Sequence, residues 1–201
     1  MVCQMASSTA SFSFIHVFPR IPAKPKFHLK DLPGSGKRID ILCRGLAACF
    51  DWAPELISRT NIEYYAVLSD KITMKFTYSP ECIGKGETWW ASVIQRVLSG
   101  VNVDFCGKMD WNLETTMKST TQDNFDLYVL DEKGTPIDTV LQHSNLSQNS
   151  FMVGDHRGFE LDTRELLRDM NVQQVSLGET SYLGSHCIAQ VISNYERISK
   201  S

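Results

Sequence analysis

The order of apolar and polar residues predicts a chain of alternating strands and helices. Apolar residues at every second position, or short unbroken runs of β-branched and aromatic residues, are typical of strands. This pattern predicts strands over residues 12–18, 62–68, 72–78, 126–131, 151–153 and 172–177. Apolar residues spaced three or four apart indicate amphipathic helices. This spacing predicts one helix with Ile41, Leu42, Leu46 and Phe50 on its apolar side, a second over 87–99, a third with Leu166, Leu167 and Met170, and a fourth with Ile188, Val191, Ile192, Tyr195 and Ile198.

The segment from Val175 to Ile192 is the most informative part of this pattern. A short buried strand ends at Leu177, and a glycine-bearing loop from Gly178 to Gly184 follows it. Ser185 is a good N-cap residue and predicts the start of the last helix. Because the first N–H groups of a helix have no partner within it, this loop and helix start can hold a polar ligand without a charged side chain.

Three strands in the C-terminal half end in loops that we expect to meet. The loops follow Leu130, Val153 and Leu177, and helices or loops separate the strands. Alternating strands and helices predict an α/β fold with a mostly parallel sheet flanked by helices. Ligands of open α/β sheets bind at the carboxyl ends of the strands. The sequence therefore predicts a ligand pocket formed by these three loops.

The composition sets limits on the class of protein. We expect one domain over residues 12–201, preceded by a flexible polar tail at 1–11. The formal net charge of −3 shows no global basic signature, so nucleic-acid contact requires a local patch. The six cysteines form no Cys-x-x-Cys pair, so we expect reduced thiols in a cytoplasmic protein and no metal site. No apolar run approaches the roughly 18 residues that a membrane span needs, so no membrane partner is expected.

Other segments carry weaker signals. Residues 107–124 are polar and poorly periodic and predict an excursion or a short strand–loop unit, and 142–150 predict a surface loop. Lys133–Pro136 has turn composition, and Asp162 or Thr163 is expected to cap the third helix. The Trp89–Trp90 pair is able to stack on a base, although packing in the core is favoured.

Several short motifs, in one order along the chain, resemble a known family. They are Asp31-Leu-Pro-Gly-Ser35, Arg38-Ile-Asp-Ile-Leu-Cys-Arg44, Tyr64-Tyr-Ala-Val-Leu68, Val153-Gly-Asp-His156 with Gly158, Val175-Ser-Leu177 and Ser185-His-Cys-Ile188. The same motifs occur in the archaeal tRNA pseudouridine-54 N1-methyltransferases of the SPOUT superfamily. The chain resembles a bacterial-type relative of that family over residues 12–198.

The resemblance implies a fold, a cofactor and a site. The fold would be a SPOUT-type sheet with a C-terminal trefoil knot, and a homodimer would complete the active site. S-adenosylmethionine (SAM) would contact Leu130, Gly154, Leu177 and Cys187. Arg38 and Asp40 would face the target base in a structured RNA, either tRNA or rRNA.

The sequence alone leaves more than one role open for Cys187, for His186 and for the Asp155–His156 pair. Cys187 lies near a helix start, where a thiolate nucleophile is conceivable, but packing is the more common role, and the resemblance favours cofactor contact. His186 is a candidate general base or a surface histidine. Asp155 and His156 lack a third group for a catalytic triad. Gly154 and Gly158 fit either an ordinary turn or close approach of the backbone to a cofactor.

Arg38 and Asp40 are the candidate catalytic residues. Methylation at N1 of a pseudouridine requires removal of a ring proton, which Asp40 would accept or orient, while Arg38 would offset charge on the uracil carbonyls. The alternative is a helix-start carboxylate beside a solvated arginine. A basic cluster of Lys30, Lys37, Arg38 and Arg44 is predicted to contact RNA phosphates.

The sequence therefore predicts a SAM-dependent RNA methyltransferase that acts on pseudouridine N1. Two other functions remain open at this point. One is a non-catalytic RNA-binding module that keeps the knotted fold, and the other is a cysteine hydrolase that uses Cys187.

Overall fold

The computed structural model describes residues 11–53, 58–122, 125–144, 146 and 148–199. The strands are β1 (Phe12–Phe18), β2 (Ile62–Leu68), β3 (Ile72–Phe76), β4 (Cys106–Met109), β5 (Asp126–Pro136), β6 (Asn149–Val153) and β7 (Gln173–Ser176). The helices are α1 (Leu32–Ser35), α2 (Ile39–Phe50), α3 (Gly86–Leu98), α4 (Leu113–Gln122), α5 (Ile137–His143), α6 (Leu161–Asp169) and α7 (Gly184–Ser199). Two 3₁₀ helices cover Arg59–Asn61 and Pro80–Cys82. Apart from Ser11, the predicted tail lies outside the described residues.

The strands form one seven-stranded sheet in the order β4-β3-β2-β1-β6-β5-β7. The five strands from β2 to β7 in this order run parallel, whereas β3 and β4 are antiparallel to their neighbours. The central strand β1 pairs with β2 on one side and with β6 on the other. The order in which the chain adds strands therefore reverses at β1. Open α/β sheets bind their ligands in a crevice at such a point. The predicted mostly parallel α/β fold is confirmed.

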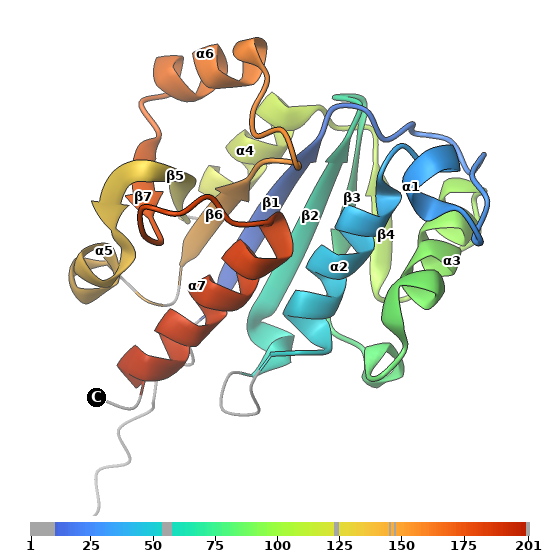
Figure 1. Ribbon diagram of the computed structural model, residues 1–201, viewed down its shortest axis with the longest axis horizontal. Coiled ribbons are helices and arrows are strands. Elements are labelled where there is room, and N and C mark those ends of the chain that lie inside the picture. Colours follow the sequence, from blue (N-terminus) through green and yellow to red (C-terminus); the bar gives the residue numbers. More distant parts are fainter. Residues whose placement is uncertain (1–10, 54–57, 123–124, 145, 147, 200–201) are drawn as a thin grey trace, which may run out of the picture.

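Helices cover both faces of the sheet. In Figure 1, α2, α3 and α7 lie in front of the strands and α4 lies behind them. Successive residues of β1 point to opposite faces, so Phe14 packs in the core with α2 and α7, while Ile15 packs against Leu113 and Met117 of α4. Both faces are buried, which explains why the strands are apolar runs rather than strict alternations.

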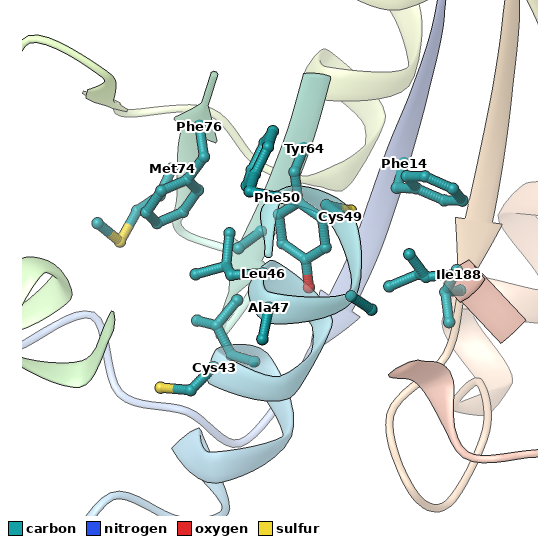
Figure 2. Packing of buried hydrophobic residues seen from close by; sticks show 14 of the residues in the cluster. Phe14, Cys43, Leu46, Ala47, Cys49, Phe50, Tyr64, Met74, Phe76 and Ile188 are labelled. Atoms are coloured by element: carbon teal, nitrogen blue, oxygen red, sulfur yellow. The ribbon is translucent and has the colours of Figure 1, made fainter. Parts of the chain in front are cut away.

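The larger core lies between the sheet and α2. Figure 2 shows Leu46, Ala47 and Phe50 of α2 close to Tyr64 of β2. Tyr64 and Phe50 are fully buried, and so is Trp90 of α3, which packs on Phe50 and Phe76. The prediction that Trp90 belongs to the core is confirmed.

The predicted excursion at 107–124 is instead the end of β4 and the helix α4. The buried positions of α4 are Leu113, Thr116, Met117 and Thr120, which have helical spacing. Two of these four positions are threonines, so apolar periodicity does not show the helix. Thr116 and Thr120 bury their hydroxyls by bonding carbonyl oxygens one turn back.

The segment after Leu130 also differs from the prediction. The expected turn at Lys133–Pro136 is part of β5, whose pairing with β7 is interrupted between Leu130 and Thr135. The expected loop at 142–150 begins inside α5 and ends inside β6. Pro136 comes directly before α5 and lacks only an N–H that the helix start does not use, so proline here starts a helix rather than a loop.

Two predicted helix caps are wrong. α6 begins at Leu161 after Glu160, so Asp162 and Thr163 lie inside its first turn. α7 begins at Gly184, so Ser185 is inside the helix and not at its N-cap. Position 184 has no room for a side chain, because a Cβ there would lie 2.7 Å from the His16 ring.

Candidate functional site

A cavity of about 840 Å³ opens at the carboxyl ends of β5, β6 and β7. Its walls come from the three segments that the sequence predicts: the end of β5 with Asp131 and Glu132, the loop Gly154–Phe159 after β6, and the loop Leu177–Gly184 after β7. Parallel pairing of β5 with both β6 and β7 brings these segments together.

The four residues predicted to contact a cofactor all line this cavity. They are Leu130, Gly154, Leu177 and Cys187. Leu130 and Leu177 are half-buried beside the larger core and form apolar wall. The structure therefore brings together residues that are up to 57 positions apart in the sequence.

The loop after β6 folds back on itself. The N–H of Gly158 donates to the carbonyl of Asp155 at 2.9 Å, and Gly158 has a φ of +75°. A Cβ on Gly154 would lie 2.9 Å from the backbone of Gly158. Glycine at 154 is therefore required for this close turn, which exposes its backbone to the cavity.

Cys187 is not an activated thiol. It lies in the first turn of α7 and its Sγ is 3.8 Å from the carbonyl oxygen of Tyr182. Burial, with the negative charge of Glu132, raises the pKa of Cys187 to about 11. These effects outweigh the helix start, which alone would favour a thiolate. The geometry disfavours a nucleophile and leaves Cys187 as cavity wall.

The buried histidine of the site is His16, which the sequence analysis missed. His16 is fully buried in β1, and its Nε2 lies 3.1 Å from the carbonyl oxygen of Gly154. His186, the predicted candidate, is exposed on α7 and does not line the cavity. His16 is, with Ser13, one of two polar residues in the otherwise apolar run Phe12–Phe18, and this break in the pattern is the signal that would have found it.

Arg38 and Asp40 form an ion-paired cluster at the start of α2. Arg38 donates from Nε and Nη2 to the two carboxylate oxygens of Asp40, at 3.1 and 3.0 Å. Arg44 donates to Oδ2 of Asp40 at 2.8 Å and to Glu87 at 2.9 Å. The side chain of Asp40 is 1% exposed and that of Arg38 is 40% exposed. Asp40 is thus held beneath two guanidinium groups, and Arg38 faces outward.

The backbone at Lys37 and Arg38 is unusual. Both residues are left-handed, with φ of +52° and +73°. Non-glycine residues in this region are strained and are common at functional sites. This conformation directs the chain from α1 into α2 and leaves Arg38 as a helix cap without a side-chain capping bond.

A small hollow, too narrow to hold a water molecule, lies between Arg38 and the loop after β6. Lys37 and Arg38 line it from one side, and Asp155 and His156 line it from the other. Asp155 and His156 also line the large cavity. Arg38 therefore lies next to the cavity rim, whereas Asp40 lines neither space.

Comparison with known proteins shows the family of this chain. Residues 12–199 match the model of a family described as "Putative SAM-dependent RNA methyltransferase". The chain belongs to this family. The predicted class of SAM-dependent RNA methyltransferase, with SAM as cofactor, is thereby confirmed at the level of the family.

Relatives cover nearly the full chain. The chain is 31% identical to a tRNA (pseudouridine(54)-N(1))-methyltransferase of Thermococcus onnurineus, covering 89% of this chain and 94% of that protein. It is 28% identical to the protein of the same name from Methanocella arvoryzae, covering 89% and 95%. The crystal structure of Archaeoglobus fulgidus Nep1 bound to S-adenosylhomocysteine superimposes with a TM-score of 0.63 and 16% identity, covering 96% of this chain and all of that one. That likeness supports the fold.

The residues of the cavity fit SAM. Its volume lies within the range of about 300–1,000 Å³ that is typical of small-molecule sites. Leu130 and Leu177 offer apolar walls for an adenine ring, and Asp131 and Glu132 offer carboxylates for ribose hydroxyls. A hydrogen bond from Ser181 lowers the pKa of Glu132, so that this group is an acceptor at neutral pH. The close Gly154–Gly158 turn leaves room that a side chain at 154 would fill.

The surroundings of the site carry exposed basic residues. Lys30 and Lys37 of the predicted basic cluster are exposed, whereas Arg44 is engaged by Asp40 and Glu87.

Within the described part of the chain, no group of three or more potential metal ligands is present. No helix among the described residues is long and apolar enough to cross a membrane.

Proposed function

We propose that this protein methylates N1 of a pseudouridine in tRNA, at the position equivalent to 54. The observation that carries the proposal is the meeting of Leu130, Gly154, Leu177 and Cys187 in one cavity beside Arg38. The relatives named for this reaction support the substrate. Pseudouridine differs from uridine in having a free N1–H, because its ribose is attached to carbon.

The cofactor supplies an electrophilic methyl group, and the protein supplies position. The irregular part of β5 after Leu130 and the loops after β6 and β7 would hold SAM at the sheet edge. Holding both reactants in line removes most of the entropic barrier of a two-substrate reaction. The wall of Leu130 and Leu177 would exclude water from the reacting atoms.

Arg38 would bind the base, and Asp40 would hold Arg38 in place. The guanidinium of Arg38 is partly exposed and next to the hollow, so it would offset negative charge on the uracil carbonyls as N1 loses its proton. Both oxygens of Asp40 are occupied by guanidinium groups and its side chain is buried. These contacts favour the orienting role of Asp40 over proton acceptance.

The segment Pro19–Arg44 would carry the RNA backbone. It contains seven Lys or Arg and two Asp or Glu, a net charge of +5 in a chain of net charge −3. Lys24, Lys26, Lys30 and Lys37 are exposed and make no ion pair within the described part of the chain. Gln95 of α3 fixes the segment by donating to the carbonyls of Pro25 and Phe27, at 3.0 and 2.8 Å. Fixed lysines beside Arg38 suit a phosphate backbone.

Assembly and topology are part of the proposal. Leu161, Tyr182 and Leu183 are large exposed apolar side chains, and two of them lie on the loop at the cavity. They would be covered by a second copy in a homodimer. The chain leaves edge strand β7 and returns as α7, which packs against α2 (Figure 1), and we propose that this C-terminal part is tied in a trefoil knot. We place residues 12–201 in one domain of a cytoplasmic enzyme.

A reconstituted assay tests the function. The protein, SAM and a tRNA transcript carrying pseudouridine at position 54 are incubated, and the nucleosides are analysed by mass spectrometry. We expect 1-methylpseudouridine with this RNA and none with the uridine transcript. SAM binding without methylation of any tRNA or rRNA tested would instead support a non-catalytic RNA-binding module.

A further inference from the structure

We propose that Asp155 accepts the N1 proton of the target base. This inference rests on the proposed function and adds a catalytic residue to it. Arg38 would neutralise negative charge on the base, and Asp40 would hold Arg38 in place. Both oxygens of Asp40, however, accept hydrogen bonds from guanidinium groups. Another carboxylate that faces the substrate would fill this role.

Asp155 occupies the boundary between the two spaces of the site. It lines the cofactor cavity, and it also lines the small hollow that contains Arg38. A base placed against Arg38 and approached by a methyl group from the cavity would have its ring edge at this residue. The negative charge of Asp155 also contributes to the raised pKa of Arg38, after the contribution of Asp40.

The two carboxylate oxygens of Asp155 have different surroundings. Oδ1 accepts a hydrogen bond from the N–H of Arg157 at 2.7 Å, which fixes the side chain. Oδ2 accepts no hydrogen bond from any described residue, and Nδ1 of His156 is 3.7 Å away. The side chain is 6% exposed, so it is largely shielded from bulk water. One held oxygen and one available oxygen suit a proton acceptor.

The other carboxylates of the cavity are worse placed. Asp131 accepts a hydrogen bond from the N–H of Lys133, and Glu132 is bonded by Ser181. Both lie within β5, and neither lines the hollow of Arg38. Asp155 is thus the carboxylate shared by both spaces among the described residues.

The proposed step transfers one proton to Asp155 and one methyl group to N1. The N1–H bond of the base breaks and its proton goes to Oδ2 of Asp155. The electron pair left on N1 forms the new bond to the methyl carbon, while the bond between that carbon and the sulfonium of SAM breaks with its pair left on sulfur. The proton then leaves Asp155 for water.

The variant Asp155→Asn tests this role with little change in shape. Oδ1 of the asparagine keeps the bond to the N–H of Arg157, which places the amide NH₂ where Oδ2 was. A donor then faces the N1–H donor of the base. Asp110→Asn, an exposed carboxylate after β4, is the matched control and is expected to behave as wild type.

Two measurements are made on each protein. In single-turnover methylation of the pseudouridine tRNA, Asp155→Asn is expected to lose about 10²–10⁴-fold in rate, the range for general-base catalysis. Without SAM, wild type is expected to bind the pseudouridine tRNA several-fold more tightly than the uridine tRNA, and Asp155→Asn to lose this preference. SAM affinity by calorimetry should stay within about twofold.

The outcomes separate the two proposals. Failure of wild type to methylate either tRNA would reject the proposed function. An active wild type together with an Asp155→Asn variant within about threefold of its rate would overturn the role of Asp155. Loss of SAM binding in Asp155→Asn would also overturn it, because the residue would then shape the cofactor cavity. An Asp155→Glu variant that regains part of the rate would support proton acceptance over a structural role.

Discussion

Nε2 of His16 lies 3.1 Å from the carbonyl oxygen of Gly154, so the central strand β1 is linked to the loop after β6. A carbonyl only accepts, so Nε2 carries the proton. Nδ1 then accepts from the hydroxyl of Tyr64, 2.7 Å away. Burial lowers the pKa of His16 to about 3, so the ring is neutral near pH 7. Tyr64, His16 and Gly154 form a buried polar chain from β2 to the cavity.

The stability of the protein is expected to depend on pH through His16. The unfolded residue titrates near pH 6.5 and the folded one near pH 3. Between these values the unfolded state binds one more proton, so the free energy of unfolding falls by about 1.4 kcal/mol per pH unit as pH decreases. The total loss is about 5 kcal/mol at pH 3, and above pH 6.5 the contribution is constant. Urea denaturation of wild type and His16→Asn from pH 7.5 to 4.5 measures this, and equal slopes for the two proteins would contradict it.

Asp40→Asn is expected to lower the free energy of unfolding by about 2 kcal/mol. Removing one partner of a fully buried ion pair costs about 3–5 kcal/mol. The loss is smaller here because the Arg38 and Arg44 side chains are 40% and 34% exposed and can be solvated. Glu87→Gln, which removes an outer partner of Arg44, is the control and should cost about 0.5 kcal/mol. Urea denaturation at pH 7 checks both, and an unchanged Asp40→Asn would show that the cluster adds no stability.

Gly154→Ala is expected to weaken SAM binding by at least about tenfold, or about 1.4 kcal/mol. The added Cβ would lie 2.9 Å from the Gly158 backbone and would open the turn. Gly107→Ala is the matched control, because its Cβ would meet nothing within 4 Å. Neither glycine has a positive φ, so the comparison isolates space. Calorimetry with SAM measures both variants, and equal affinities would show that the turn does not form the cofactor site.

Cys187 is expected to react slowly with iodoacetamide. With a pKa of about 11, its thiolate fraction at pH 7.5 is lower than that of an ordinary thiol by a factor of about 100 or more. Labelling is followed by mass spectrometry in a Cys3→Ser background, since Cys3 lies outside the described residues. The rate should rise with pH up to 11 and fall when SAM is bound. Fast labelling at pH 7.5 would revive the hydrolase alternative.

The sequence predicts the apolar parts of the fold and fails where polar residues are buried. Strands β1, β2 and β6 are apolar runs, and their positions are confirmed within a few residues. Helix α4 is missed because Thr116 and Thr120 occupy buried positions. Their hydroxyls bond to the helix backbone, and Thr116 also bonds Thr73 at 2.6 Å. Hydrophobic periodicity cannot reveal pairing between residues distant in sequence.

The sequence also predicts only part of the site, because hydrophobic periodicity does not show contacts between residues that are distant in sequence. The loops after Leu130, Val153 and Leu177 can be placed at one edge from strand order alone, and the cavity confirms that inference. His16 and the setting of Asp155 depend on the pairing of β1 with β6, which brings residues about 140 positions apart together. The catalytic roles of Arg38 and Asp40 stay predictions, although the structure shows how the two are joined.

The pairing of β1 with β6 has a consequence for biosynthesis. Ser13 of β1 bonds Ser150 of β6, 137 residues later, whereas its other neighbour β2 follows after about 50. At translation speeds of about 5–20 residues per second, the first strand waits about 7–27 seconds with one edge uncovered. Such long-range parallel pairing folds slowly and leaves an edge open to aggregation. The N-terminal half is therefore expected to need chaperone protection on the ribosome until β6 emerges.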